Sequence, residues 1–105
     1  MTAYTVVTPN SVRTVIETLA GRPLVLDTET DGLDPWTGRL RMVQLASEPE
    51  HTWIFLPDCW DAVRDILLGA QILIGHNITG FDLLWLDRFG ILSLEEAEER
   101  VLDTL

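Results

Sequence analysis

Apolar side chains recur at helical spacing near the start of this chain. The pattern runs from Val12 to Leu19 and predicts an amphipathic helix. Thr8 is suited to cap this helix, and Gly21 is suited to end it. We therefore expect one helix to precede the first long apolar run.

Three apolar runs follow, and each is short enough to be a β-strand. They cover residues 24–26, 40–46 and 52–56. Only short polar segments separate them, with turn residues in between. Because short connections join neighbouring strands that run in opposite directions, we expect an antiparallel three-strand meander.

Helices and strands alternate in the second half of the chain. Asp58 is expected to cap a helix that runs to about Leu68. The apolar run at residues 72–74 then predicts a strand. It should lie parallel to an earlier strand, because a helix connects them. A third helix is expected to begin near Thr79 or Gly80.

The last residues predict a short helix and part of another strand. Ser93 and Glu96 have the spacing of a capping box, and residues 101–102 are apolar. The predicted fold class is therefore α/β, with a mixed sheet that joins the antiparallel meander to one or more parallel strands and carries packed helices. The whole chain, residues 1–105, is expected to be one domain.

The composition fits a small domain with a hydrophobic core. Apolar residues make up 47% of the chain. No apolar run approaches the ~18 residues of a membrane span, and the N-terminus lacks the pattern of a signal peptide. The single cysteine, Cys59, allows neither an internal disulfide nor a cysteine-based zinc cluster. We expect a reducing, cytoplasmic location and no membrane partner.

The net charge of −10 bears on whether this chain binds nucleic acid. Broad electrostatic capture of nucleic acid usually needs a basic surface. Much of the negative charge lies in residues 95–99, which are expected to form a solvated helix face. An enzyme that binds divalent cations also brings positive charge that the sequence does not contain. The acidic balance therefore lowers the expectation of nucleic-acid binding without excluding it.

Asp27 and Glu29 follow the first apolar run directly. Side chains two positions apart on a strand share a face, so these carboxylates should lie side by side if the strand continues that far. Adjacent carboxylates repel each other, and a divalent cation removes the repulsion. Oxygen ligands favour Mg²⁺ or Mn²⁺, and two such ions can support phosphodiester hydrolysis.

Two other interpretations of this segment remain open. Asp27 and Glu29 can be ordinary strand-end and turn residues, which is the more common role of such acids. The segment also has the start of an EF-hand calcium loop. However, Gly38 stands at the twelfth loop position, where an acidic residue is required, and a strand rather than a helix precedes the segment.

A second polar cluster follows residues 72–74. Asn77 lies in the turn after this strand, and Asp82 lies in the first turn of the next predicted helix. The helix dipole favours an acid at that position in any case, and Phe81 suits a core. Taken alone, this cluster fits a structural role as well as a functional one.

Together, the two clusters resemble the motifs of DEDD-type 3′→5′ exonucleases, in particular the proofreading domains of family A DNA polymerases. Residues 26–35, followed by residues 38–40 and 43–46, look like the first motif. Residues 76–82 are similar to the second motif, Asn-x-x-x-Phe-Asp. Residues 101–105 resemble the strand-to-helix junction that comes next in those domains.

The resemblance implies a partial exonuclease domain with a ribonuclease H-like fold. Asp27, Glu29 and Asp82 would be catalytic metal ligands in a two-metal site for Mg²⁺ or Mn²⁺. The implied substrate-binding residues are Thr28, Thr30, Leu33, Asn77 and Phe81. The implied partner is the 3′ end of a single nucleic-acid strand, with DNA favoured over RNA, and the product is a nucleoside monophosphate. Trp36 is a further candidate for substrate contact.

One part of the family pattern is missing from these residues. The third motif is Tyr or His followed four residues later by Asp, and no suitable late position carries it. Asp103 is no substitute, because the resemblance places it at the strand–helix junction. We therefore expect weak metal binding and slow or absent hydrolysis from this chain alone.

Three explanations of the missing motif stay open. The sequence can be the front part of a larger exonuclease or polymerase. A second polypeptide can supply the motif. The domain can also be degenerate and retained for binding nucleic acid or protein. Exposed apolar surface on an incomplete sheet would favour self-association or a partner chain. A ribonuclease D-like RNA exonuclease is the related alternative activity.

Overall fold

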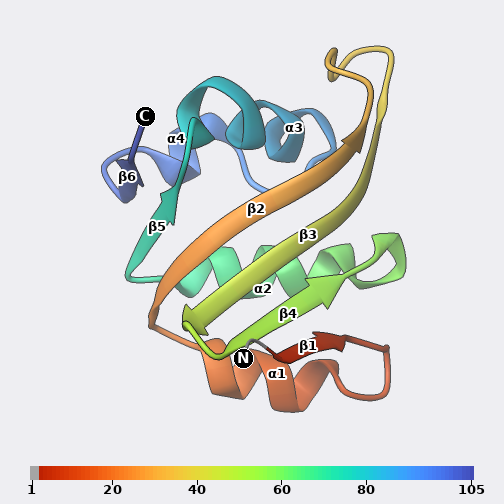
Figure 1. Ribbon diagram of the computed structural model, residues 1–105, viewed down its shortest axis with the longest axis vertical. Coiled ribbons are helices and arrows are strands. Elements are labelled where there is room, and N and C mark those ends of the chain that lie inside the picture. The colour runs from red at the N-terminus through yellow and green to blue at the C-terminus, as the bar shows by residue number, and fades with distance from the viewer. Residues whose placement is uncertain (1–2) are drawn as a thin grey trace.

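The protein forms a single mixed β-sheet with helices packed against it (Figure 1). The structure is a computed structural model that describes residues 3–105. Within that range the strands are β1 (Ala3–Val6), β2 (Pro23–Asp31), β3 (Arg39–Glu48), β4 (His51–Phe55), β5 (Ile72–Gly75) and β6 (Val101–Asp103). The helices are α1 (Val12–Leu19), α2 (Trp60–Gly69), α3 (Leu83–Arg88) and α4 (Leu94–Ala97), with short helical turns at Pro57–Cys59 and Ile78–Asp82.

The strand pairing confirms the predicted mixed sheet. The spatial order is β1-β4-β3-β2-β5-β6. β2, β3 and β4 form the antiparallel meander, and β5 lies parallel to β2 on its other side. β6 continues the sheet parallel to β5, as the apolar residues 101–102 predicted. β1, which pairs in parallel with β4, was not predicted.

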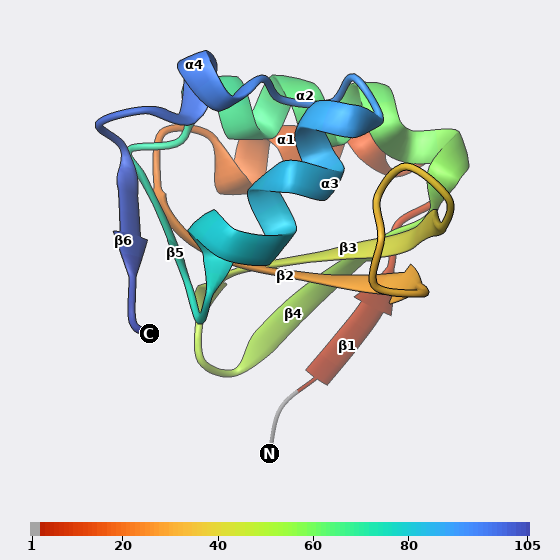
Figure 2. The ribbon, with the colours of Figure 1, turned by 90° about the horizontal axis from the view of Figure 1, so that it is seen from above.

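All four helices lie on the same side of the sheet, and the other side is open (Figure 2). Strand side chains alternate accordingly. On β2, Leu24, Leu26 and Thr28 are buried under the helices, whereas Val25 and Asp27 are exposed on the open face. The core therefore lies between the sheet and one helical layer. No helix in residues 3–105 is long and apolar enough to cross a membrane.

Two predicted helix starts are wrong. α1 begins at Val12 with Ser11 as its N-cap, and not at Thr8. The Thr8 carbonyl instead accepts a hydrogen bond from the Ser11 amide at 2.9 Å, which closes a turn before the helix. Asp58 lies within the 3₁₀ turn Pro57–Cys59 that precedes α2. The proline begins that turn, so the chain is already helical before the position that Asp58 was expected to cap.

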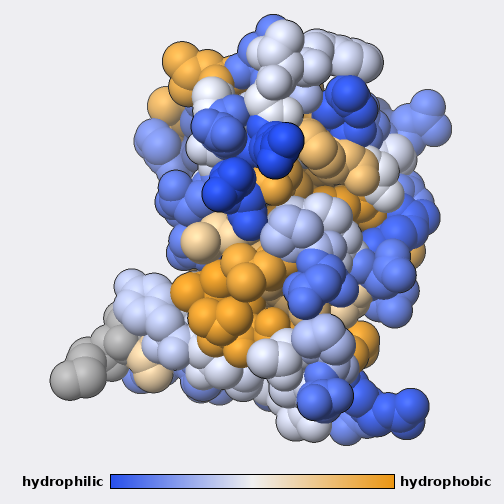
Figure 3. All heavy atoms as spheres, turned by 90° about the vertical axis from the view of Figure 1, so that its right-hand side faces the viewer, coloured by the Kyte–Doolittle hydropathy of each residue, from blue (hydrophilic) through white to orange (hydrophobic). Residues whose placement is uncertain are grey.

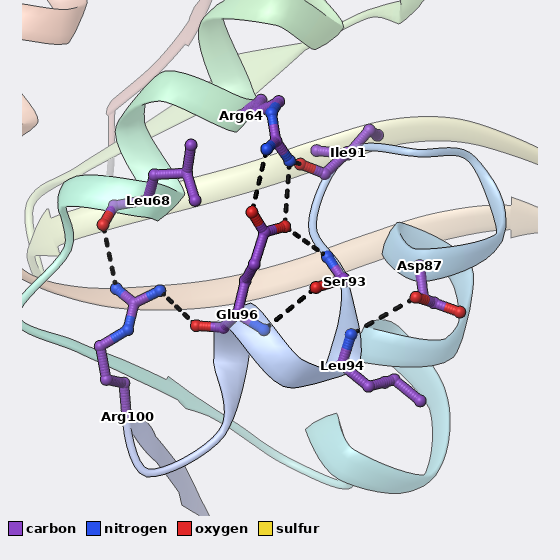
Figure 4. Close-up of polar contacts among 8 residues, drawn as sticks. All are labelled: Arg64, Leu68, Asp87, Ile91, Ser93, Leu94, Glu96 and Arg100. Carbon is purple, nitrogen blue, oxygen red and sulfur yellow. Dashed lines mark hydrogen bonds and ion pairs between the residues drawn. The ribbon is translucent and has the colours of Figure 1, made fainter.

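Two arginines attach the segment around α4 to α2 (Figure 4). Arg64 on α2 donates to both carboxylate oxygens of Glu96, at 2.9 and 3.1 Å. Glu96 and Ser93 also form the predicted capping box. Arg100 donates hydrogen bonds of 2.8–3.4 Å to three carbonyl oxygens at the end of α2, and one of 2.8 Å to the Glu96 carbonyl. The short helix α4 therefore depends on tertiary contacts more than on its own length.

Replacing Glu96 by glutamine is expected to lower the melting temperature at pH 7. The hydrogen bonds from Arg64 and from the Ser93 amide lower the pKa of Glu96 from 4.5 to about 2. A pKa that is depressed in the folded state stabilises the fold above the unfolded-state value and loses that effect as the pH falls. Thermal melts of the variant and the wild type should therefore converge between pH 4.5 and pH 2.

Glu98→Gln is the matched control, because Glu98 is exposed and its side chain makes no hydrogen bond or ion pair within residues 3–105. Its melting temperature should follow that of the wild type at each pH. A Glu96→Gln deficit of the same size at pH 7 and pH 2 would show that the ion pair is not its cause.

Candidate active site

Strand β2 places the first predicted pair of carboxylates. It continues through both positions, so Asp27 and Glu29 share the open face of the sheet as expected. Both side chains are exposed. Thr28 lies between them in sequence and points to the opposite side, where it is 7% exposed. The strand therefore presents two acids outward and one hydroxyl inward.

A β-bulge interrupts the pairing of β2 with β3 directly after Glu29. Glu29 pairs with Met42, whereas Thr30 pairs with Leu40. Arg41 is therefore the extra residue and has no partner on β2. A bulge of this kind redirects a side chain and is common beside active sites.

Asp82 meets β2 at Thr28. The Thr28 hydroxyl donates a hydrogen bond to Asp82 Oδ1. The backbone amide of the same threonine donates to Asp27 Oδ1 at 3.0 Å. Asp82 is only 3% exposed. One residue of β2 thus binds a carboxylate from each of the two predicted motifs.

The surroundings of Asp82 disfavour its negative charge. Burial raises the pKa of the Asp82 carboxyl above its ordinary value, and the charge of Asp27 adds to this rise, while the hydrogen bond from Thr28 opposes it. Within residues 3–105, the ion pairs are those of Arg22 and Arg64, and neither involves these acids. Two carboxylates without a cationic partner suit a divalent cation, which prefers oxygen ligands.

Thr28 contacts Asp27 through its amide and Asp82 through its hydroxyl, while Asp27 and Glu29 share the open face of the sheet. No group of three or more His, Cys, Asp or Glu side chains in residues 3–105 lies close enough to hold a metal ion. The carboxylate oxygens of Asp27, Glu29 and Asp82 are nevertheless the type of donor that a divalent cation prefers.

Asn77 and Phe81 lie on the turn that carries Asp82. Asn77 has a φ of 53° and a ψ of 32°, a left-handed conformation that asparagine tolerates better than most residues. The following turn, Ile78–Asp82, is π-helical, a form often found at functional sites. A Cβ atom on Gly80 would lie 2.5 Å from Asn77 Oδ1, so any larger residue at position 80 would collide with the Asn77 side chain. Phe81 is half-buried against Trp85, with ring centroids 5.9 Å apart.

The loop after β2 presents its apolar side chains to solvent. Leu33 is 86% exposed and Trp36 is 76% exposed. The Thr30 hydroxyl donates to the Gly32 carbonyl at 2.9 Å and so fixes the start of the loop. The Arg88 guanidinium lies 4.9 Å from the centre of the Trp36 ring, within the range of a cation–π contact. Leu33 and Trp36 are thus accessible to a ligand, but they do not form an enclosed nucleotide pocket.

The base of this loop packs directly on α3. A Cβ atom on Gly38 would lie 2.1 Å from the Asp31 carbonyl oxygen and 2.7 Å from Cη2 of Trp85. Trp85 is fully buried and stacks with Phe89, with ring centroids 6.1 Å apart. Its indole nitrogen has no hydrogen-bond partner in residues 3–105. Close packing at Gly38 therefore connects the loop that carries Leu33 to the helix that follows Asp82.

Asp103 has a role that the sequence did not reveal. Its carboxylate accepts hydrogen bonds from the backbone amides of Leu105 and Thr79, each at 3.0 Å. These bonds lower the pKa of Asp103 below its ordinary value. The Thr79 amide belongs to the turn that carries Asp82, so β6 helps to hold that turn in place.

Thr28 was expected to border the substrate, and its contact with Asp82 was missed. The signal was present in the alternation of β2, because a residue between two exposed acids on one strand must point inward. A buried hydroxyl needs a partner. The nearest predicted acid on the helical side of the sheet was Asp82.

Replacing Thr28 by valine is expected to raise the Asp82 pKa further and to destabilise the fold by about 1–3 kcal/mol at pH 7, because a buried carboxylate loses its hydroxyl donor. The loss should shrink as the pH falls and Asp82 becomes protonated, since a neutral acid depends less on that donor. Denaturant unfolding in EDTA at several pH values measures both effects. Thr37→Val is the control, because Thr37 is exposed and its hydroxyl has no partner within residues 3–105. An equal loss for Thr28→Val at every pH would contradict the role given to Asp82.

Comparison with known proteins identifies the family of this chain. A model of the 3′-5′ exonuclease family matches residues 4–103. No curated protein sequence matches the chain. Escherichia coli RNase D, described as an exoribonuclease involved in structured RNA processing, is similar in structure with a TM-score of 0.71 and 21% identity. That likeness covers 97% of this chain and 27% of RNase D.

Two further structures share the fold. The catalytic core of RRP6 from Trypanosoma brucei has a TM-score of 0.69 and 16% identity, over 99% of this chain and 29% of that one. Brucella melitensis NrnC with bound Mg²⁺ has a TM-score of 0.63 and 22% identity, over 99% of this chain and 50% of that one. The chain thus spans under a third of RNase D and of the RRP6 core, and half of NrnC. Its ribonuclease H-like sheet and the family match over residues 4–103 together show that this chain belongs to the 3′-5′ exonuclease family.

Proposed function

We propose that this chain is part of a metal-dependent, DEDD-type exonuclease that removes nucleoside monophosphates from the 3′ end of single-stranded nucleic acid. The observation that carries the proposal is that Thr28 contacts both Asp27 and Asp82. One acid comes from each motif of the sequence, and neither forms an ion pair among residues 3–105. Membership of the 3′-5′ exonuclease family supplies the class of reaction.

Asp27, Glu29 and Asp82 are the proposed ligands for Mg²⁺ or Mn²⁺. A purely oxygen donor set suits these hard cations. The bound ions would supply an activated water and charge stabilisation for the leaving oxygen. Thr28 orients two of the three ligands, Asp27 through its amide and Asp82 through its hydroxyl.

The remaining motif residues are proposed to hold the terminal nucleotides. Leu33 is free to contact a base, because its side chain is almost fully exposed in the loop after β2. Thr30 fixes that loop, and Asn77 and Phe81 flank Asp82 from the neighbouring turn. The hydroxyl of Thr28 is bound to Asp82, so Thr28 would border the nucleotide through its backbone and not its hydroxyl.

The rest of the catalytic site is proposed to come from outside these residues. A fourth carboxylate and a Tyr or His would complete it, supplied by further sequence of the same protein, by a polymerase domain, by a partner chain or by a second copy. DNA is the proposed substrate, because residues 26–35 resemble the first motif of proofreading polymerase domains. RNA is the alternative that an assay must compare directly.

The test is degradation of 5′-labelled single strands of DNA and RNA with the same sequence. With Mg²⁺ or Mn²⁺, the purified protein should shorten one of them stepwise from the 3′ end and release nucleoside monophosphates. EDTA should stop the reaction, and a blocked 3′ end should prevent it. Internal cleavage, or cleavage that survives EDTA, would refute the proposal. Strand binding without cleavage under any metal condition would support a non-catalytic binding module instead.

A further inference from the structure

The start of β3 extends beyond the end of β4. Val43 pairs with Phe55, the last residue of β4, so residues 39–41 have no strand beside them on that edge. A shallow depression of about 290 Å³ lies there. It is lined by Arg39, Leu40, Arg41, Leu56 and Pro57. Two cationic side chains thus flank an apolar floor at the edge of the sheet.

Neither arginine of this depression is used within the protein. Arg39 and Arg41 are exposed and have no hydrogen bond or ion pair with any residue from 3 to 105. Arg39 lies opposite Asp31 in the strand register, and Arg41 is the bulged residue beside the Glu29 pair. If their purpose were to balance these acids, cross-strand ion pairs would be expected, and none is formed.

The distribution of the other cations makes this pair distinctive. All seven basic residues of the chain are arginines. Four contact other groups of the protein, namely Arg22, Arg64, Arg88 and Arg100. Arg13 lies on α1, on the helical side of the sheet. Arg39 and Arg41 are therefore the arginines that lie free near the exposed acids of β2, in a protein whose net charge is −10.

The surface beside the depression is apolar. Val6 is 51% exposed and lies opposite Ile54, and Leu56, directly after β4, is 37% exposed. Figure 3 looks at the molecule from this side and shows an apolar patch at the level of β1 and β4, with strongly hydrophilic side chains above it. A nucleic-acid strand offers both matching groups, because its phosphates are anionic and its bases are flat and apolar on their faces.

We propose that Arg39 and Arg41 bind a phosphodiester group of the substrate strand, upstream of the 3′-terminal nucleotide, with Leu56 supporting the adjoining nucleotide. The proposal rests on the proposed function. The register places the bulge beside Glu29, two positions from Asp27, which is about 7 Å along the strand. Arginine suits this role, because its planar guanidinium forms paired hydrogen bonds with phosphate.

The test is strand binding by a protein that carries Asp27→Asn, so that no substrate is consumed. A fluorescent single-stranded 12-mer is titrated by anisotropy over a range of salt concentrations. Adding Arg39→Gln and Arg41→Gln should raise the Kd about tenfold for each arginine at low salt. The slope of log K against log salt should become shallower by about 0.7 for each phosphate that the variant no longer neutralises. Arg13→Gln is the control and should change neither quantity.

Two further measurements separate this role from the alternatives. The melting temperature of the double variant should equal that of its parent, and the affinity for a nucleoside monophosphate should be unchanged. A lower melting temperature with unchanged strand affinity would show that the arginines only balance Glu29 and Asp31, and would overturn the proposal. Loss of monophosphate affinity would place them at the terminal nucleotide and would also overturn it.

Failure of the phosphate subsite can be distinguished from failure of the proposed exonuclease activity. Stepwise cleavage with an unchanged KM in the double variant would support the exonuclease activity and refute the phosphate subsite. A higher KM with an unchanged kcat would support the exonuclease activity and the subsite. Strand binding that depends on Arg39 and Arg41, in a protein that never cleaves the strand, would support the subsite and refute the exonuclease activity. A protein without strand affinity would overturn the subsite.

Discussion

Replacing Asp27 by asparagine is expected to slow 3′→5′ cleavage by about a thousandfold, because metal ions contribute several kcal/mol of transition-state stabilisation to phosphodiester hydrolysis. The fold should remain intact, since Asp27 is exposed and its charge disfavours the buried anion of Asp82. Single-turnover rates at saturating Mg²⁺ measure the loss. Thermal melts with and without Mg²⁺ provide a second readout, because a ligand that binds only the folded state raises the melting temperature.

Asp65→Asn is the matched control for this substitution. Asp65 is an exposed acid on α2, with no side-chain hydrogen bond or ion pair among residues 3–105. The substitution Asp65→Asn removes the same charge on the helical side of the sheet. The cleavage rate and the metal-dependent shift in melting temperature should therefore stay at wild-type values. Full activity of the Asp27→Asn variant, or an unchanged metal-dependent shift in its melting temperature, would show that Asp27 is not a metal ligand.

Replacing Gly38 by alanine is expected to destabilise the protein by about 3 kcal/mol, the upper end of the usual cost of overpacking a closed position. The added Cβ would lie 2.1 Å from the Asp31 carbonyl oxygen and 2.7 Å from the Trp85 ring. The oxygen belongs to the backbone of β2, and Trp85 is fully buried, so neither can move away freely. Denaturant unfolding measures this loss.

The control for Gly38→Ala uses a glycine with free space around it. A Cβ atom on Gly69 would meet nothing within 4 Å, and Gly69 is the last residue of α2. Gly69→Ala is expected to be neutral or to stabilise by up to about 1 kcal/mol, since alanine has less conformational freedom in the unfolded chain. Equal stability of the two variants would show that the loop moves away from Trp85 without cost.

Most of the sheet could be predicted because its signals are local. Runs of apolar residues with short turns gave the meander, and a helical crossover gave the parallel strand β5. β1 was missed because it has only four residues, three of them exposed. It is defined by pairing with β4, a strand almost half the chain away, and no sequence pattern of residues 3–6 encodes that partner.

The site could be predicted as a set of residues but not as a geometry. The two motifs supplied Asp27, Glu29 and Asp82, and the metal roles of these acids stay a prediction. The contact of Asp82 with Thr28 depends on how the turn after β5 packs against β2. The bulge at Arg41 was also hidden, because the alternating exposure of a regular strand accounts for both Arg39 and Arg41. A bulge is a property of the pairing between two strands, and neither strand reveals it alone.

The hydrogen bond from Thr79 to Asp103 links two segments that are distant in the sequence, and we expect them to open as one cooperative unit. The amide that donates to Asp103 lies in the same turn as Asp82, while Asp103 itself lies on β6 at the border of the sheet. Proteins open in such units, and a border strand opens more readily than the core. Each opening of β6 exposes the Thr79 amide to exchange with solvent and loosens the turn beneath it. We therefore expect the time that Asp82 stays buried to depend on β6 at the edge of the sheet as well as on Thr28 in its interior.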